Sequence, residues 1–330
     1  MNSNLLTPIL LIGFNRPNTL NEQLQRIDQL EERTVYISID GVPDKCSEGL
    51  MEAWQSCVSV AKSWSMNTPH NALLVIHPEN LGLYDHFKSA LIDFFGKFPV
   101  GIVLEDDIVF VSEFINFVDE NHALLINGDC WSIEGNNPLG RHDLVCAPKD
   151  VVVAFQQTYI HTISGWASSA KNVQVFINFC DQRLSWTEVV GVISRFSRKV
   201  TRDPVLRVGI QATWLRKMKR ARAKGLAGSW DNTWELAGWS SQIPSLMPNF
   251  SLSRESSDQV EGQSHPHSIL GDPWNSDSLP ASISVENDIY TLSRKSDLSM
   301  LSIWGIRRAY CWIFFLRLLK QRRNLMNSND

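Results

Sequence analysis

The sequence of 330 residues predicts an α/β fold in which helices cover both faces of a mostly parallel sheet. Two observations lead to this class. Short apolar runs recur through the first hundred residues, and helix-like segments separate them. Because strands buried on both faces read as continuous apolar runs, this alternation favours a parallel sheet. With 43% hydrophobic and 20% charged residues, the chain has enough apolar side chains for a full core, in one large domain or two joined lobes.

Each predicted element comes from its own segment. Strands are expected at residues 8–13, 35–41, 72–76 and 98–108, and helices at 20–30 and 86–95. The carboxyl ends of parallel strands meet at one edge of the sheet, where such folds bind ligands. Polar residues follow all four strands at this edge, namely Arg16, Asp40, Asn80 and the acidic residues 105–107.

The strongest single signal is the triplet Glu105, Asp106 and Asp107 at the end of an apolar strand. Three adjacent carboxylates are unfavourable there unless a positive group lies nearby. Mg²⁺ and Mn²⁺ prefer such oxygen ligands, and they leave other positions open for water and a substrate diphosphate. The triplet therefore predicts a metal-dependent nucleotide-sugar site, and a solvated turn is the alternative interpretation.

Further motifs accompany the triplet in a fixed order. They are Asn80-Leu81-Gly82-Leu83, then His86, Lys88, Ala90 and Leu91, then Phe98-Pro99, then Val103 to Ile108. Over residues 8–120 this pattern resembles the GT-A glycosyltransferases of the N-acetylglucosaminyltransferase I group and related bacterial sugar transferases. The resemblance implies a GT-A fold, which is Rossmann-like, and a hexosyl- or N-acetylhexosaminyltransferase. Such an enzyme moves a sugar from a nucleotide sugar, here a UDP-sugar, to a hydroxyl acceptor with inversion.

The resemblance also assigns roles in donor binding. It places Asp107 on the metal, Mn²⁺ or Mg²⁺, Asp106 on the ribose and Glu105 on the donor sugar. Carboxylates suit the last two roles because they accept hydrogen bonds from hydroxyl groups. Arg16 and Asp40 would contact the base, with Asn80 and His86 nearby. The alternatives are structural: Arg16 as a cap of the first turn, Asp40 as an ordinary turn residue, and His86 as a satisfied residue at a helix start.

The second half of the chain contains fewer signals. Gly165-Trp166 resembles a turn of the same family where the backbone approaches the sugar, and glycine leaves room for that contact. The resemblance makes Asp231 the catalytic base, with Glu235 one helical turn later as its substitute. The alternative for the flanking Trp230 and Trp234 is core packing. The basic insertion at residues 185–228 either attracts an anionic acceptor or anionic lipid, or forms a solvated basic helix.

The predicted organisation is a nucleotide-sugar half at residues 1–150, an acceptor half at 151–270, a linker at 271–299 and an amphipathic tail at 300–330. His267, or else His265, is a candidate second metal ligand, with an exposed turn as the alternative. The tail combines aromatic and basic residues, so it either lies on an anionic membrane surface or docks on the enzyme's own core.

Several classes of protein are disfavoured. A net charge of −4 gives no case for a nucleic-acid partner, and six scattered cysteines do not form a zinc or disulfide framework. No Walker loop or Rossmann glycine fingerprint is present. The start of the chain lacks a signal-peptide pattern, so we expect a cytoplasmic enzyme that is peripheral on the inner membrane face. Its expected acceptor is a saccharide or lipid-linked saccharide of surface-glycan or glycolipid biosynthesis. The rival predictions are a nucleotidyltransferase and a non-catalytic, membrane-associated sugar-binding module.

Overall fold

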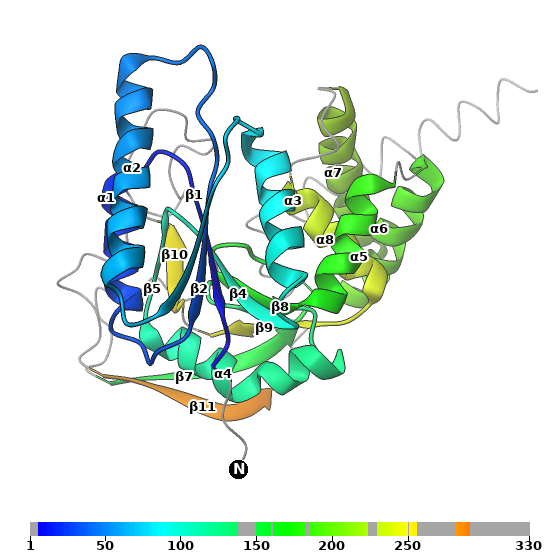
Figure 1. Cartoon of the computed structure of the whole chain (residues 1–330). Helices are drawn as coiled ribbons and strands as arrows, with labels where there is room; N and C mark the ends of the chain where they lie inside the picture. The colour runs from blue at the N-terminus through cyan, green and yellow to red at the C-terminus, as the bar shows by residue number, and fades with distance from the viewer. Residues whose placement is uncertain are drawn as a thin grey trace, which may run out of the picture.

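The computed structural model describes residues 6–137, 150–159, 161–182, 185–223, 230–249, 251–255 and 282–290. In these residues the chain forms an α/β structure on a mixed, mostly parallel sheet of nine strands, with helices on both faces (Figure 1). The strand order is β11-β7-β9-β6-β8-β4-β1-β2-β3. The predicted fold class is confirmed at this level, and strands from residues 1–150 and 151–270 share the sheet.

One part of the sheet consists of four parallel strands, and all four were expected. They are β3 (Asn71–Ile76), β2 (Thr34–Ile39), β1 (Ile9–Gly13) and β4 (Val100–Glu105).

Strand β1 shows why these segments are apolar throughout. Ile9 and Leu11 lie in a core cluster with residues of helices α1 (Pro17–Ile27) and α2 (Glu48–Asn67), whereas Leu10 lies in a second cluster with residues of α3 (Gly82–Phe95). Because successive side chains of a strand point to opposite faces, both faces of this strand are buried.

The other part of the sheet is mixed. Strand β8 (Trp166–Ser169) runs antiparallel to both β4 and β6 (Ile133–Glu134). Beyond β6 lie β9 (Ser245–Pro248), β7 (Asp150–Thr158) and the outermost strand β11 (Ser282–Tyr290). The prediction of a linker at 271–299 was wrong for residues 282–290, because this segment pairs in parallel with β7.

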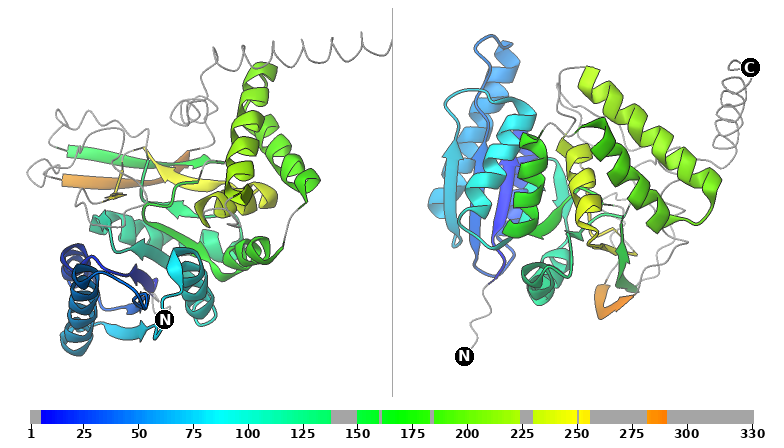
Figure 2. Two further views of the ribbon diagram at one scale, coloured as in Figure 1. Left: turned by 90° about the horizontal axis from the view of Figure 1, so that it is seen from above. Right: turned by 90° about the vertical axis from the view of Figure 1, so that its right-hand side faces the viewer.

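The remaining helices are α4 (Ser112–Asn127), α5 (Ala170–Asp181), α6 (Trp186–Val200), α7 (Pro204–Ala223) and α8 (Trp230–Ser241). The described part of the basic insertion forms α6 and α7. These helices share a third core cluster with α8, through residues such as Val189, Trp214 and Trp239. Figure 2 shows α6, α7 and α8 on the side of the molecule away from α1 and α2.

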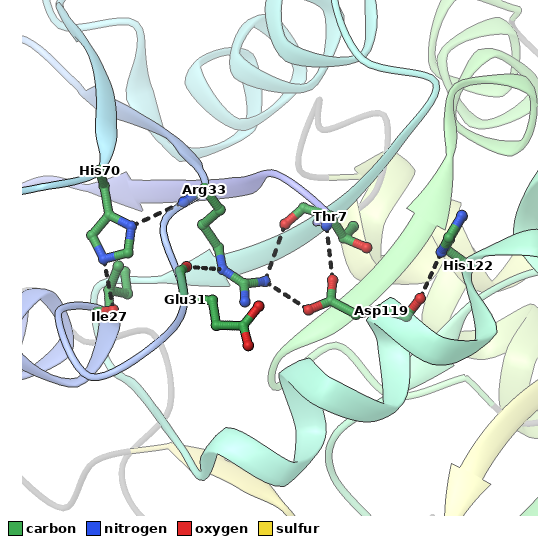
Figure 3. Close-up of polar contacts among 7 residues, drawn as sticks. All are labelled: Thr7, Ile27, Glu31, Arg33, His70, Asp119 and His122. Carbon is green, nitrogen blue, oxygen red and sulfur yellow. Dashed lines mark hydrogen bonds and ion pairs between the residues drawn. The ribbon is translucent and has the colours of Figure 1, made fainter. Parts of the chain in front are cut away.

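A buried network joins the amino ends of the parallel strands (Figure 3). Arg33, directly before β2, donates through Nη1 to Asp119 Oδ2 of α4 at 3.0 Å. The other oxygen of Asp119 accepts from the backbone N–H of Thr7, ahead of β1, at 2.8 Å. His70, directly before β3, accepts from Arg33 N–H at 3.2 Å and donates through Nε2 to Ile27 O at 2.9 Å. The network therefore fixes three strand starts against α1 and α4.

Within the described residues, no helix is both long enough and apolar enough to cross a bilayer. The predicted tail at residues 300–330 lies outside the described residues.

Candidate functional site

The acidic triplet lies at the carboxyl edge of the sheet, as the sequence predicts. Glu105 is the last residue of β4, and Asp106 and Asp107 form the turn that follows. The chain continues directly into a short strand, β5 (Ile108–Phe110), which pairs antiparallel with β10 (Ser253–Glu255). A second, two-stranded sheet therefore holds the far side of the turn in place.

Arg16 joins the triplet from the neighbouring strand end. Since β1 and β4 are adjacent and parallel, the residues after them meet. Arg16 Nη1 contacts Asp106 Oδ1 at 2.5 Å and Asp107 Oδ2 at 3.2 Å. The backbone N–H of Phe14 donates to the second oxygen of Asp106 at 2.9 Å. The segment after β1 therefore supplies a guanidinium and a backbone N–H donor to the carboxylates that follow β4.

The two aspartates differ in environment. The Asp106 side chain is 5% exposed, and burial raises its pKa to about 6 although Arg16 opposes that shift. The Asp107 side chain is 20% exposed, and Arg16 contacts it through Oδ2. Burial also acts to lower the pKa of Arg16, but the carboxylates of Asp106 and Asp107 outweigh it and raise that pKa. Asp106 is thus enclosed by the protein, whereas Asp107 is accessible to a ligand.

Charge at this edge is unbalanced. Asp106 and Asp107, when ionised, bring two negative charges that share the single guanidinium of Arg16, and Glu105 adds negative charge near the same guanidinium. A divalent cation beside Asp107 would add positive charge to this group. Mg²⁺ and Mn²⁺ commonly use one or two protein carboxylates together with water and phosphate oxygens. The donor set around Asp107 therefore fits such an ion bound together with a diphosphate.

Asp40 is satisfied by the protein itself. Its Oδ1 accepts from the N–H groups of Gly41 and Leu81, and its Oδ2 accepts from Gly82 N–H and Asn80 Nδ2, all at 2.9–3.1 Å. Four acceptor positions are about the capacity of a carboxylate, so direct binding of a base would require one of these bonds to open. The contacts join the loop after β2 to the start of α3. Asp40 therefore holds these two segments together, and they form the wall beside the site.

His86 lies on the inner side of the same wall. Its Nε2 is 2.9 Å from Ser38 Oγ of β2, and its ring packs edge-on against His77, with centroids 5.1 Å apart. Burial lowers the pKa of His86 to about 4, although Asp40 acts in the opposite direction. The imidazole is therefore neutral near pH 7. His77 follows β3 directly, and its proximity to His86 becomes visible only once β2 and β3 are paired.

Gly165 lies against the strand that follows the triplet. Its φ is +80°, and a Cβ atom there would lie 2.9 Å from Ser253 Oγ and 3.2 Å from Ile108 Cγ2. The predicted Gly-Trp turn therefore does bring the backbone next to the acidic turn. Trp166, by contrast, is 1% exposed and packs against Trp234 at 4.4 Å between ring centroids, so it belongs to the core.

Helix α8 contains the candidate base. Asp231 lies in its first turn, between two tryptophans that are both buried. Trp230 stacks on Phe87 at 3.8 Å, directly beside His86 in α3, and Trp234 packs among Trp131, Trp166 and Phe176. Core packing of both tryptophans, the structural alternative, is therefore what the structure shows. It also fixes the start of α8 against α3.

Glu235 is the more buried of the two candidate carboxyl groups on α8. It is 7% exposed, whereas Asp231, one helical turn earlier, is half-buried. Burial raises the pKa of Glu235 well above the usual range. A general base must come within hydrogen-bond distance of the hydroxyl that it deprotonates, and the burial of Glu235 disfavours that contact.

Sequence reasoning missed two groups near the acidic turn. Ser253 of β10 donates through Oγ to Ser164 O, and it lies against both Gly135 and Gly165. The Cys57 thiol of α2 is buried near Arg16 and Asp106, and burial raises its pKa to about 12. Neither position has a local signal in the sequence. His265 and His267 lie outside the described residues.

Within the described ranges, no cluster of three or more histidine, cysteine, aspartate and glutamate side chains has the arrangement of a metal site. A cation held by Asp107 would therefore take its further ligands from the substrate, from water or from residues outside the described ranges. No known family model matches the chain, and no curated protein is significantly similar to it.

Proposed function

We propose that this chain is a metal-dependent GT-A glycosyltransferase that transfers a sugar from a UDP-type nucleotide sugar to a hydroxyl acceptor, with inversion. The main support is the arrangement at the carboxyl edge of the sheet, where Asp106 and Asp107 share one guanidinium and the Asp107 side chain remains 20% exposed. The α/β class and the position of the triplet agree with the resemblance of residues 8–120 to that family.

In this proposal the donor is bound by the acidic turn and the wall beside it. Asp107 would hold Mn²⁺ or Mg²⁺, which supplies positive charge for the diphosphate leaving group when bound. Glu105 accepts hydroxyl groups of the sugar. Asp106 would accept those of the ribose if one of its bonds, to Arg16 or to the N–H of Phe14, opened. Arg16 offsets part of the carboxylate charge, while Asp40, Asn80 and His86 shape the pocket for the base.

Asp231 acts as the base. It takes the proton of the acceptor hydroxyl while that oxygen bonds to the anomeric carbon, and the bond from this carbon to the diphosphate breaks with its electron pair on the diphosphate oxygen. Attack opposite to the leaving group inverts the anomeric centre. The stack of Trp230 on Phe87 ties this helix start to α3, which also contains His86.

The acceptor would be a saccharide or a lipid-linked saccharide of surface-glycan or glycolipid biosynthesis. Helices α6 and α7 expose basic side chains that suit an anionic acceptor or the surface of an anionic membrane. They are Arg195, Arg198, Lys199, Arg216, Lys217 and Lys219.

Calorimetry with UDP, with and without Mn²⁺, tests the donor site. We expect Mn²⁺ to enhance UDP binding to the native chain and to the control Asp93→Asn, which changes an exposed carboxylate on α3. Asp107→Asn should lose this enhancement. Native protein that shows no manganese-enhanced binding of any nucleoside diphosphate would contradict the proposal.

A donor screen separates the rival functions. With UDP-, GDP- and CMP-sugars, a transferase releases the corresponding nucleotide and slowly hydrolyses its preferred donor when no acceptor is present. A nucleotidyltransferase releases pyrophosphate from a nucleoside triphosphate, and a binding module releases neither. In the productive reaction, Asp231→Asn should lower turnover by about 10²- to 10⁴-fold.

A further inference from the structure

A cluster of buried polar side chains lies beneath α8. Its members come from β6, the segment before β8, β9 and α8, and none is more than 7% exposed apart from the partly buried Thr162. They are Ser132, Glu134, His161, Thr162, Ser245 and Glu235. Two carboxyl groups in one buried cluster are unfavourable if both are ionised, since burial and mutual repulsion act together.

The two carboxyl groups are not equivalent. Glu134 accepts hydrogen bonds on both oxygens, from Ser132 Oγ at 2.5 Å and from Thr162 Oγ1 at 3.2 Å. Ser245 adds a further hydroxyl donor to the same carboxylate. Glu235 accepts the backbone N–H of His161, and its Oε2 has no hydrogen-bond partner among the described residues. Hydrogen bonds therefore make Glu134 the first of the two to ionise, although burial raises its pKa to about 8, and leave Glu235 to be the neutral member of the pair.

The groups that face Glu235 support this assignment. Glu134 of β6 and Asp231 of α8 both disfavour a further negative charge, while Lys217 of α7 favours it. Lys217 is exposed and lies over the Trp214 ring, so water screens its effect. His161 is buried, and burial lowers its pKa to about 3, so it brings no positive charge at neutral pH.

The fit of α8 against this cluster is close. A Cβ atom on Gly238 would lie 2.4 Å from His161 Nε2 and 2.9 Å from Trp131 Nε1. At Gly238 the inner side of the helix therefore lies directly on His161 and Trp131. Ionisation of Glu235 would favour its transfer to water and so draw α8 away from β6, and Asp231 lies on the same helix.

We propose that Glu235 remains protonated in the working enzyme and acts as a positioning residue, which keeps α8 docked so that Asp231 stays at the active site. The part that concerns Asp231 rests on the function proposed above. In this scheme Glu235 keeps its proton throughout, and the proton of the acceptor goes to Asp231 alone. A neutral Glu235 also adds no charge beside Asp231, which can then stay ionised and accept that proton.

Infrared spectroscopy tests the protonation state without any assay of activity. At about pH 9, above the value of about 8 to which burial raises the pKa of Glu134, the native chain should retain the carbonyl band of a buried carboxylic acid. The band should disappear in Glu235→Gln and persist in Glu134→Gln. A spectrum of the native chain without that band, or a band that survives in Glu235→Gln, overturns the assignment. Should Glu235→Gln not fold, the band at this pH must still be present in both the native chain and Glu134→Gln, and its absence from either overturns the assignment.

Transfer assays test the positioning role. Glu235→Gln, neutral and of similar shape, should keep kcat within about tenfold of the native enzyme and shift the alkaline limb of its pH profile to higher pH. Glu235→Ala and Gly238→Ala, which disturb the docking of α8, should lose about 100-fold at every pH. A loss in Glu235→Gln as large as in Asp231→Asn would instead identify Glu235 as a base. If no variant and no native sample transfers sugar, the proposed function fails while the infrared result still decides the protonation of Glu235.

Discussion

Two buried arginine–aspartate pairs lie at opposite edges of the same sheet, and they differ in charge balance. At the amino edge, Arg33 faces one carboxylate, Asp119, and further donors and acceptors satisfy both side chains. At the carboxyl edge, Arg16 faces Asp106 and Asp107 with Glu105 nearby, and Asp107 is open to solvent.

The difference indicates which pair is structural and which is available for a ligand. A balanced, fully bonded pair has nothing left to bind, and its loss leaves an uncompensated buried charge. A pair with excess negative charge is itself destabilising, so its persistence suggests that a cation joins it. Substitutions at the carboxyl edge should therefore lower activity, and substitutions at the amino edge should lower stability.

The largest expected effect is that of Asp107→Asn on catalysis. It removes the accessible carboxylate, and we expect turnover to fall by about 10²- to 10³-fold because charge stabilisation at the leaving group is lost. Its thermal stability should stay the same or rise, since only one of the two carboxylates that share Arg16 remains charged. Steady-state kinetics and a melting curve on the same sample measure both. A melting temperature that falls together with activity would mean that the carboxyl edge is structural too.

Asp119→Asn should show the opposite behaviour. The buried guanidinium of Arg33, 1% exposed, loses its counter-charge, so we expect a loss of about 3 kcal/mol in the free energy of unfolding. Activity per folded molecule should not change, because the pair lies at the other end of the strands. Urea denaturation and active-site-normalised kinetics give the two numbers. A large loss of turnover in the folded fraction would contradict this separation of the edges.

His86 gives the carboxyl edge a pH dependence. Burial lowers its pKa to about 4 in the folded chain, while an unfolded histidine titrates near 6.5. The unfolded state therefore binds more protons between these values. The stabilisation is present above about pH 6.5 and is lost as the pH falls toward about 4, by roughly 3 kcal/mol in total.

Unfolding measured across this interval tests the effect. The slope of the free energy of unfolding against pH should be smaller in His86→Gln, because the contribution of His86 is gone. Ser38→Ala removes the partner of Nε2 but leaves the imidazole buried, so it should retain the slope. Equal slopes in the native chain and in His86→Gln would show that His86 does not titrate in this interval.

Much of the carboxyl edge could be predicted from the sequence because its signals are local. Apolar runs that stop at Arg16, Asp40, Asn80 and Asp106 locate four strand ends, and parallel packing brings such ends together. The contacts made by these residues could not be predicted. Asp40 looks like a turn residue before glycine, and the amides of Leu81 and Gly82 that saturate it lie about forty positions away.

The second half shows the limits of local patterns more strongly. The sequence predicts a polar linker at residues 282–290, yet these residues pair with the edge of β7. Asp231 and Glu235 look alike on a helix, and only the docking of α8 on β6 and His161 separates an available carboxylate from a buried acid. In both cases the deciding contact is made by residues distant in sequence.

Gly165 provides the finest test of how the carboxyl edge is held. Gly165→Ala adds a side chain at φ +80°, which costs about 1–2 kcal/mol, and its Cβ would press on Ser253 and Ile108. Gly128→Ala is a matched control, because Gly128 also has φ +80° but its nearest neighbour is the flexible end of Lys171 at 3.4 Å. We expect both variants to lose similar stability because alanine is strained at this φ. Gly165→Ala should lose somewhat more, because of its contacts with Ser253 and Ile108. The added pressure on Ile108 should move Asp107, so only Gly165→Ala should weaken manganese-dependent UDP binding in calorimetry. If the two alanine variants bind UDP equally well, the position of Asp107 does not depend on the close contact between Gly165 and β5.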